Sequence, residues 1–294
     1  MFFNLKYHIA SLVAVFLALG LGILIGSAMP GDNALVKQQQ QLTGLLESQL
    51  DLLRQKNESL LARVGNLEMD NNIQRQFGYQ VLPELLGGKL NGRSVAIIET
   101  AGCVTPDEMI AALKMAGAAI QTTTVFNGAK MRDKDALLKK LNWPDMDEKK
   151  LTAKIGQEIA RAILTGETRT LNILAGEQLL KVSGRYGHPV DDVVIIGGSP
   201  DKGLINTENL DYPIIDCFRS RRVNIYGVEE SRVAYSYMRD YQKKGITTVD
   251  NIDTIPGQVS LVYAMTGQPG WYGIKSTARK LLPDMENGVP VNAR

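Results

Sequence analysis

The sequence predicts an α/β protein: one N-terminal membrane helix, then a coiled-coil stalk, then one doubly wound, mostly parallel sheet domain. Three observations support this architecture. An uncharged apolar run lies near the N-terminus, leucines then recur every seven residues, and short apolar runs alternate with amphipathic segments in the rest of the chain. The predicted parts are a cytoplasmic tail at 1–8, a transmembrane helix at 9–29, a stalk at 33–77 and an extracytoplasmic domain at 90–294.

The membrane helix is predicted from the run Ile9 to Met29, which contains no charged side chain. A helix needs about 20 apolar residues to cross the hydrocarbon core, and backbone groups inside lipid must bond within the helix. Lys6 precedes the run and Asp32 follows it, so the positive-inside bias places the N-terminus in the cytoplasm.

Two features of this run have alternative interpretations. The small residues Ser27 and Ala28 also fit the cleavage site of a signal peptide. Gly22 and Gly26 form a GxxxG pair that lets two membrane helices approach closely, although glycine is also common in single membrane helices.

The stalk is predicted from a heptad repeat. Leucine at d positions with a polar residue at one central a position, Asn57, favours a parallel two-stranded coiled coil. Arg63 at g and Glu68 at the following e carry opposite charges across such a homodimer. The alternative is an amphipathic helix that packs on its own domain. The predicted dimerisation residues are Leu46, Leu50, Leu53, Asn57, Leu60, Val64 and Leu67, together with Gly22 and Gly26.

The remaining chain alternates strands and helices, which implies right-handed βαβ units in a flavodoxin-like or Rossmann-like sheet. The order of the strands is left open. Strands are expected at 95–99, 120–126, 192–198, 223–229 and 247–252. Helices are expected at 105–117, at 133–180 with breaks at 143–144 and 166, at 211–221, at 231–245 and at 256–265.

Ligands of such sheets bind beyond the carboxyl ends of the strands, and two loops there carry candidate groups. Gly197, Gly198 and Ser199 fit a phosphate cradle, or equally an ordinary strand-to-loop turn. The loop Asp250, Asn251 and Asp253 holds a carboxylate pair suited to a cation or to acid–base chemistry. The alternative is structural, with Asp253 or Thr254 capping the next helix and Asp250 ending a strand.

Composition argues against several other functions. The net charge of +2 predicts no nucleic-acid surface. Cys103 and Cys217 are too few for a zinc CxxC site, although one disulfide between them stays open. His188 lies in a glycine-rich turn and no nucleophile elbow is present, so we expect no enzyme. Cu(I) prefers cysteine and methionine, which leaves Cys103 with Met109 as one candidate pair, although methionine is usually core filler.

Three stretches resemble the MctB family of copper transporters, whose relatives include the envelope protein SteB. They are KYHIASLVAVFLALGLGILIGS, then GRSVAIIETAG after the stalk, and GITTVDNIDTIPGQVSLVYAMTGQPGWYGIKSTARKLLP near the C-terminus. The resemblance implies a bacterial envelope protein. One branch is associated with copper homeostasis, and the other with cell division and peptidoglycan hydrolysis beside a membrane partner called SteA. The resemblance supplies no catalytic residues.

Taken together, the sequence predicts a non-enzymatic, homodimeric scaffold in the bacterial plasma membrane that binds an envelope or division protein of the SteA kind. Copper homeostasis or transport is the alternative, with copper possible only through the family resemblance. A description of the family as a channel fits this sequence poorly, because one helix lines no pore. A third possibility is a small-ligand sensor or an enzyme that uses the strand-end loops.

Overall fold

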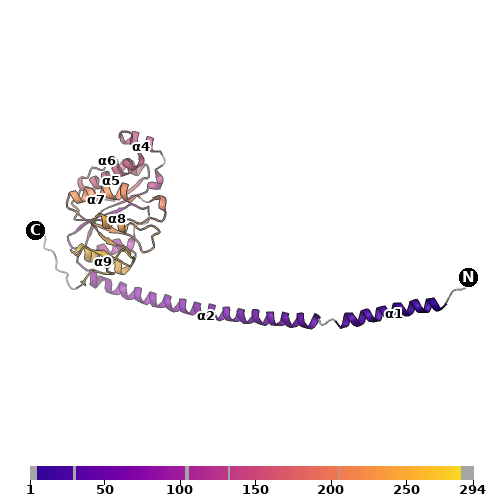
Figure 1. Ribbon diagram of the computed structural model, residues 1–294. Helices are drawn as coiled ribbons and strands as arrows, with labels where there is room; N and C mark the ends of the chain where they lie inside the picture. The colour runs from indigo at the N-terminus through magenta and orange to yellow at the C-terminus, as the bar shows by residue number, and fades with distance from the viewer. Residues whose placement is uncertain (1–4, 29–30, 103–105, 132, 205, 286–294) are drawn as a thin grey trace. The chain divides into compact units, whose positions relative to one another are not determined.

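The structure is a computed structural model that describes residues 5–28, 31–102, 106–131, 133–204 and 206–285. The chain forms two compact units that divide between Ile73 and Gln74. The first unit contains helix α1 (Leu5–Ser27) and most of helix α2 (Gly31–Leu86), and the second is the α/β domain. Because α2 crosses the boundary, its last turns belong to the second unit (Figure 1).

Helix α1 has the length and composition to cross a membrane. Residues Lys6–Ser27 form a 22-residue stretch whose most apolar 18-residue window has a mean hydropathy of 2.6. Apart from Lys6 at its start, the stretch contains no Asp, Glu, Lys or Arg. The helix therefore begins a few residues before the predicted run at 9–29 and ends within it.

Helix α2 is continuous over 56 residues and contains the whole predicted stalk at 33–77. The C-terminal end of α2 is buried in the α/β domain, whereas the apolar residues of the heptad repeat in its middle are exposed. Leu82 and Leu86 are buried against the sheet together with Leu90, so the folded domain starts before the predicted boundary at residue 90. The helical part of the stalk prediction is confirmed by the structure, while its pairing into a coiled coil remains a prediction.

The domain contains one seven-stranded sheet with the order β3-β2-β1-β4-β5-β6-β7. Every neighbouring pair is parallel except β2 with β3. The five central strands β2-β1-β4-β5-β6 follow the flavodoxin-like order, with a reversal of strand order between β1 and β4. The strands are β1 (Ser94–Glu99), β2 (Ala119–Phe126), β3 (Leu180–Gly184), β4 (Asp192–Ile196), β5 (Asn224–Val228), β6 (Thr247–Val249) and β7 (Trp271–Tyr272).

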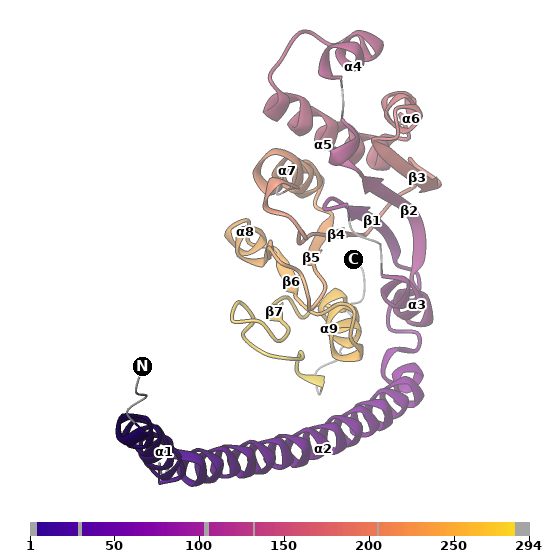
Figure 2. The same cartoon turned by 90° about the vertical axis from the view of Figure 1, so that its right-hand side faces the viewer.

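Helices cover both faces of this sheet (Figure 2). One face packs against α4–α8 and the other against α3, α9 and the end of α2. Strand β4 is buried at every position, as its continuous apolar run predicts for a central parallel strand. The helices are α3 (Asp107–Met115), α4 (Lys134–Leu141), α5 (Glu148–Thr165), α6 (Arg169–Gly176), α7 (Tyr212–Ser220), α8 (Met238–Lys243) and α9 (Ile255–Met265).

The predicted α/β class and mostly parallel sheet are confirmed, and three local expectations need correction. The edge strands β3 and β7 were not predicted, because β7 has only two residues and β3 is a largely exposed strand without an apolar run that pairs antiparallel with its single neighbour β2. The helix expected from Ser231 begins only at Met238. Ser231 does not cap it, because its N–H and hydroxyl both donate to Asp253, at 2.7 and 2.6 Å. Finally, a π-helical turn (Thr207–Asp211) precedes α7.

Candidate functional site

The candidate site lies where the parallel strands end, at the edge of the sheet that normally binds ligands in this fold. The reversal of strand order between β1 and β4 places Thr100 beside Gly197, and the Thr100 N–H donates to the Ile196 carbonyl at 3.1 Å. Strands β5 and β6 end next along the same edge. The residues that follow these four strands therefore define the site.

Three of the four strands end in a buried carboxylate. Glu99 is the last residue of β1, Glu229 follows β5, and Asp250 follows β6. Each residue exposes 1% or less of its surface. The parallel arrangement gathers these acids at one edge, because the carboxyl ends of parallel strands point the same way. Sequence reasoning missed Glu99 and Glu229, although an acid directly after an apolar strand was a readable signal.

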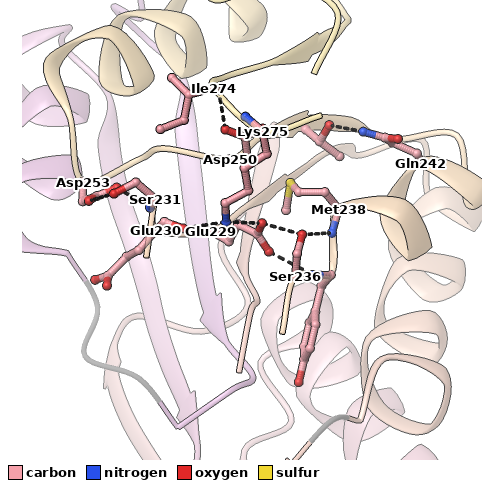
Figure 3. Close-up of polar contacts among 12 residues, drawn as sticks. Glu229, Glu230, Ser231, Ser236, Met238, Gln242, Asp250, Asp253, Ile274 and Lys275 are labelled. Carbon is pink, nitrogen blue, oxygen red and sulfur yellow. Dashed lines mark hydrogen bonds and ion pairs between the residues drawn. The ribbon is translucent and has the colours of Figure 1, made fainter. Parts of the chain in front are cut away.

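Glu229 is neutralised by an ion pair with Lys275, 2.6 Å from its Oε1 (Figure 3). The Ser236 hydroxyl donates to the same oxygen at 2.6 Å, and the Tyr237 N–H donates to Oε2 at 2.9 Å. Lys275 also donates to the Glu230 carbonyl at 3.0 Å. A buried carboxylate with a cation and two further donors is well satisfied, so this cluster stabilises the domain edge.

Asp250 forms hydrogen bonds with the backbone of the segment that follows β7. Its two carboxylate oxygens accept the N–H groups of Ile274 and Lys275, at 2.7 and 3.1 Å (Figure 3). Asp253 accepts from Ser231 instead, so the predicted carboxylate pair is engaged by two different segments of the chain.

Asn251 and Thr254 serve the start of α9. The Asn251 amide donates to the Thr254 hydroxyl at 3.0 Å, and the Thr254 Oγ1 accepts the Gly257 N–H at 3.2 Å as the helix cap. These contacts fit the structural alternative for the loop 250–253, in which Thr254 caps the helix. Ligand binding by Asp250, Asn251 and Asp253 remains a prediction.

The turn Gly197, Gly198 and Ser199 is also tightly packed by the protein itself. A side chain on Gly197 would overlap the Tyr241 hydroxyl and the Tyr237 ring, and Gly198 has a positive φ of +84°. The Ser199 hydroxyl donates to the Asp201 carbonyl at 2.7 Å. Backbone packing and local hydrogen bonds therefore account for these residue types, and phosphate binding here remains a prediction.

Asp211 is a buried acid at this edge that sequence reasoning missed. Its Oδ2 accepts the Tyr241 hydroxyl at 2.7 Å, while no partner for its Oδ1 is found among the described residues. Desolvation raises the pKa of Asp211 to about 7, against the lowering effects of the Tyr241 and Thr100 hydroxyls. Its position in a π-helical turn is typical of functional segments. The hydroxyl of Tyr241 also lies against Gly197, so Asp211 sits close to the β1/β4 reversal.

The candidate copper ligands are only partly described. Met109 is completely buried in the apolar core beneath α3, as expected of core filler, and Cys103 lies outside the described residues. Cys217 is half-buried and forms no disulfide with any residue that the structure describes, and desolvation raises the pKa of its thiol. Within the described ranges, no group of three or more His, Cys, Asp or Glu side chains is placed to hold a metal ion. The Cys103–Met109 pair and the Cys103–Cys217 disulfide therefore stay untested.

The predicted dimerisation residues are uncovered in the single chain. All six apolar residues of the heptad set, from Leu46 to Leu67, are exposed on α2. An added Cβ on Gly22 or on Gly26 would meet no atom within 4 Å. Both surfaces are thus open to a partner.

A comparison with protein-family models matches residues 2–283, nearly the whole chain, to a family described as copper transport outer membrane protein, MctB. A search of curated proteins finds no match. The family match covers the apolar helix, the stalk and the α/β domain together. On this match the chain belongs to the MctB family, which is named for copper transport at the cell envelope.

Proposed function

We propose that this chain is a single-pass bacterial envelope protein of copper homeostasis, with its N-terminus in the cytoplasm and its α/β domain outside the plasma membrane. The observation that carries the proposal is the family match over residues 2–283. The apolar helix α1, with Lys6 at its start, supports the proposed anchor and its orientation.

The mode of action that we propose is that of an anchored, non-enzymatic scaffold. The strand-end edge, where a flavodoxin-like domain normally binds its ligand, carries Tyr241 against Gly197 and Lys275 on Glu229. Several polar groups described at this edge are bonded to other parts of the chain, among them the carboxylates of Glu229 and Asp250. A domain packed in this way is suited to binding a protein through its surface, and such a partner would carry out the copper step.

Deletion of the encoding gene tests the copper role. We expect the deletion strain to differ from the parent in copper tolerance and in total cell copper, and the wild-type chain to restore both values. A strain with unchanged tolerance and copper content across a copper series would contradict the proposal.

Direct copper binding is tested separately by titrating Cu(I) into the purified chain in mild detergent. A scaffold predicts negligible binding by the wild type and equally by a Cys103→Ser/Cys217→Ser variant. Stoichiometric binding that the double substitution abolishes would replace the scaffold with a copper-binding protein.

Topology is tested with a reporter at the C-terminus that is active only outside the cytoplasm. We expect the reporter on the full-length chain to be active. The measured mass of the purified protein should equal that of a chain that still contains residues 1–28. A cytoplasmic reporter would refute the orientation, and loss of the first residues would replace the anchor with a cleaved signal peptide.

A second candidate is a scaffold of cell division or wall remodelling beside a membrane partner of the SteA kind. The observation that favours it is the long exposed leucine surface of α2, which would pair two copies of the chain into the dimeric scaffold of this candidate. Affinity capture from crosslinked cells should then enrich division or wall-remodelling proteins over a control lacking residues 31–73. Equal recovery with that control would refute it.

A further inference from the structure

We propose that α2 binds a second copy of this chain as a parallel, in-register, two-stranded coiled coil. The contact surface is the seam formed by Leu46, Leu50, Leu53, Asn57, Leu60, Val64 and Leu67. This inference goes beyond the proposed function and does not depend on it, because it concerns only the partner that binds the seam of α2.

The seam is apolar and uncovered in one chain. Its six apolar residues each expose between 49 and 67% of their surface, within a helix that is unbroken over 56 residues. Soluble proteins rarely leave a contiguous apolar surface of this length in water, so a partner is expected to cover it. The spacing alternates by three and four residues, which matches the coiled-coil seam rather than the wider stripe of a helix on a globular core.

The polar member of the seam argues for a second copy as the occupant. Asn57 lies at a central a position between Leu53 and Leu60. In a parallel, in-register pair the two Asn57 side chains meet and hydrogen-bond to each other. A shift by one heptad would place each amide against Leu50 or Val64 of the partner chain, where it has no hydrogen-bond partner. One buried asparagine therefore specifies both register and two strands.

The charges beside the seam agree with the parallel arrangement. Arg63 at g of one chain faces Glu68 at e of the following heptad in the other chain, and two-fold symmetry repeats this pair. An antiparallel pair brings g positions opposite g positions and loses both contacts. Charge complementarity thus selects the same arrangement as Asn57.

Cysteine crosslinking in the full-length chain tests the orientation. In a Cys103→Ser/Cys217→Ser background, Leu46→Cys and Leu67→Cys mark the two ends of the seam, and Ser48→Cys at an f position is the matched control. We expect each seam variant to crosslink to itself at least tenfold faster than the control. Crosslinks that form only between mixed Leu46→Cys and Leu67→Cys chains would show an antiparallel pair and overturn the proposal.

Mass measurement in mild detergent tests the seam itself. The wild-type chain should be a dimer, and Leu53→Asp/Leu60→Asp should be a monomer with unchanged thermal unfolding of the α/β domain. Asn57→Leu should give a mixture that includes larger oligomers. A monomeric wild type would refute the proposal, and so would a dimer that survives Leu53→Asp/Leu60→Asp, because another surface would then hold it.

Substitution of the membrane glycines provides a control for the anchor. In Gly22→Leu/Gly26→Leu we expect the dimer to persist, because the seam is intact. Loss of the dimer in this variant alone would assign dimerisation to α1 and overturn the role of the seam.

Discussion

Leucine side chains have opposite surroundings in the two units of this chain. In the part of α2 that belongs to the first unit, Leu53 and Leu60 are exposed, whereas Leu113 in α3 of the second unit is completely buried. The second unit buries its own apolar surface against both faces of a sheet. The first unit leaves its apolar surfaces open, both on α1 and along the seam. The second unit therefore buries its apolar core within one chain, while lipid around α1 and a partner helix along α2 are the covers that we propose for the first unit.

The largest expected effect is a charge placed in the complete unit. Leu113→Asp should abolish folding of the domain, because truncation of a buried leucine alone costs about 2–5 kcal/mol and a buried charge costs more. Both tryptophans, Trp143 and Trp271, lie in this unit, so their fluorescence reports its thermal unfolding in the full chain. The matched Leu53→Asp should leave that transition unchanged. A similar loss in both variants would show that the units are not independent.

The next effect concerns the buried ion pair at the strand ends. Lys275→Met leaves Glu229 buried without a cation, which should lower the free energy of unfolding by about 3 kcal/mol. Lys280→Met removes an exposed pair with Asp284 and should lower the free energy of unfolding far less than Lys275→Met does. Denaturant titration measures the free energy of unfolding of both variants. Equal losses would show that burial does not strengthen the ion pair between Lys275 and Glu229.

A pH effect of a few kcal/mol at most is expected from Asp211. Its folded-state pKa of about 7 lies above the ordinary 3.8, so the folded domain keeps a proton that the unfolded chain has lost. The contribution of Asp211 to the free energy of unfolding should therefore be greatest below about pH 4. It should fall as the pH rises from about 4 to about 7.

Asp211→Asn should flatten this slope, as measured by denaturant titration at several pH values. The exposed Asp135→Asn serves as the control for loss of one charge. If the slope of wild type and Asp211→Asn were the same, Asp211 would not be the group that binds the proton.

The smallest effect tests the packed turn beside the β1/β4 reversal. Gly197→Ala places a methyl group against the rings of Tyr237 and Tyr241 and should cost about 1–3 kcal/mol. Gly203→Ala, whose nearest neighbour would be Asp201 at 3.6 Å, should change stability by about 0.5 kcal/mol or less. A neutral Gly197→Ala would mean that the strand-end edge has room for a ligand.

Local patterns predicted most of the elements. The apolar run within 192–198 predicted β4, and Gly166 and the 143–144 break separated the helices α4, α5 and α6 as expected. Periodicity did not predict β3, or that the helix expected at 231–245 would begin only at Met238, because pairing with β2 and the hydrogen bond from the Tyr237 N–H to Glu229 decide those segments. The candidate loops were predicted at the correct edge of the sheet, but most of their polar atoms bond to the protein itself.

The sequence by itself determined the apolar helix, the leucine repeat and the α/β alternation, because each depends on residues that are close along the chain. Only the tertiary structure decided the strand order, which brings Lys275 to Glu229 and Tyr241 to Asp211. These partners are 46 and 30 residues apart, and nothing in local composition specifies which distant side chains meet. Burial then raises the pKa values of Asp211 and Tyr241, because their desolvation exists only once the edge is assembled.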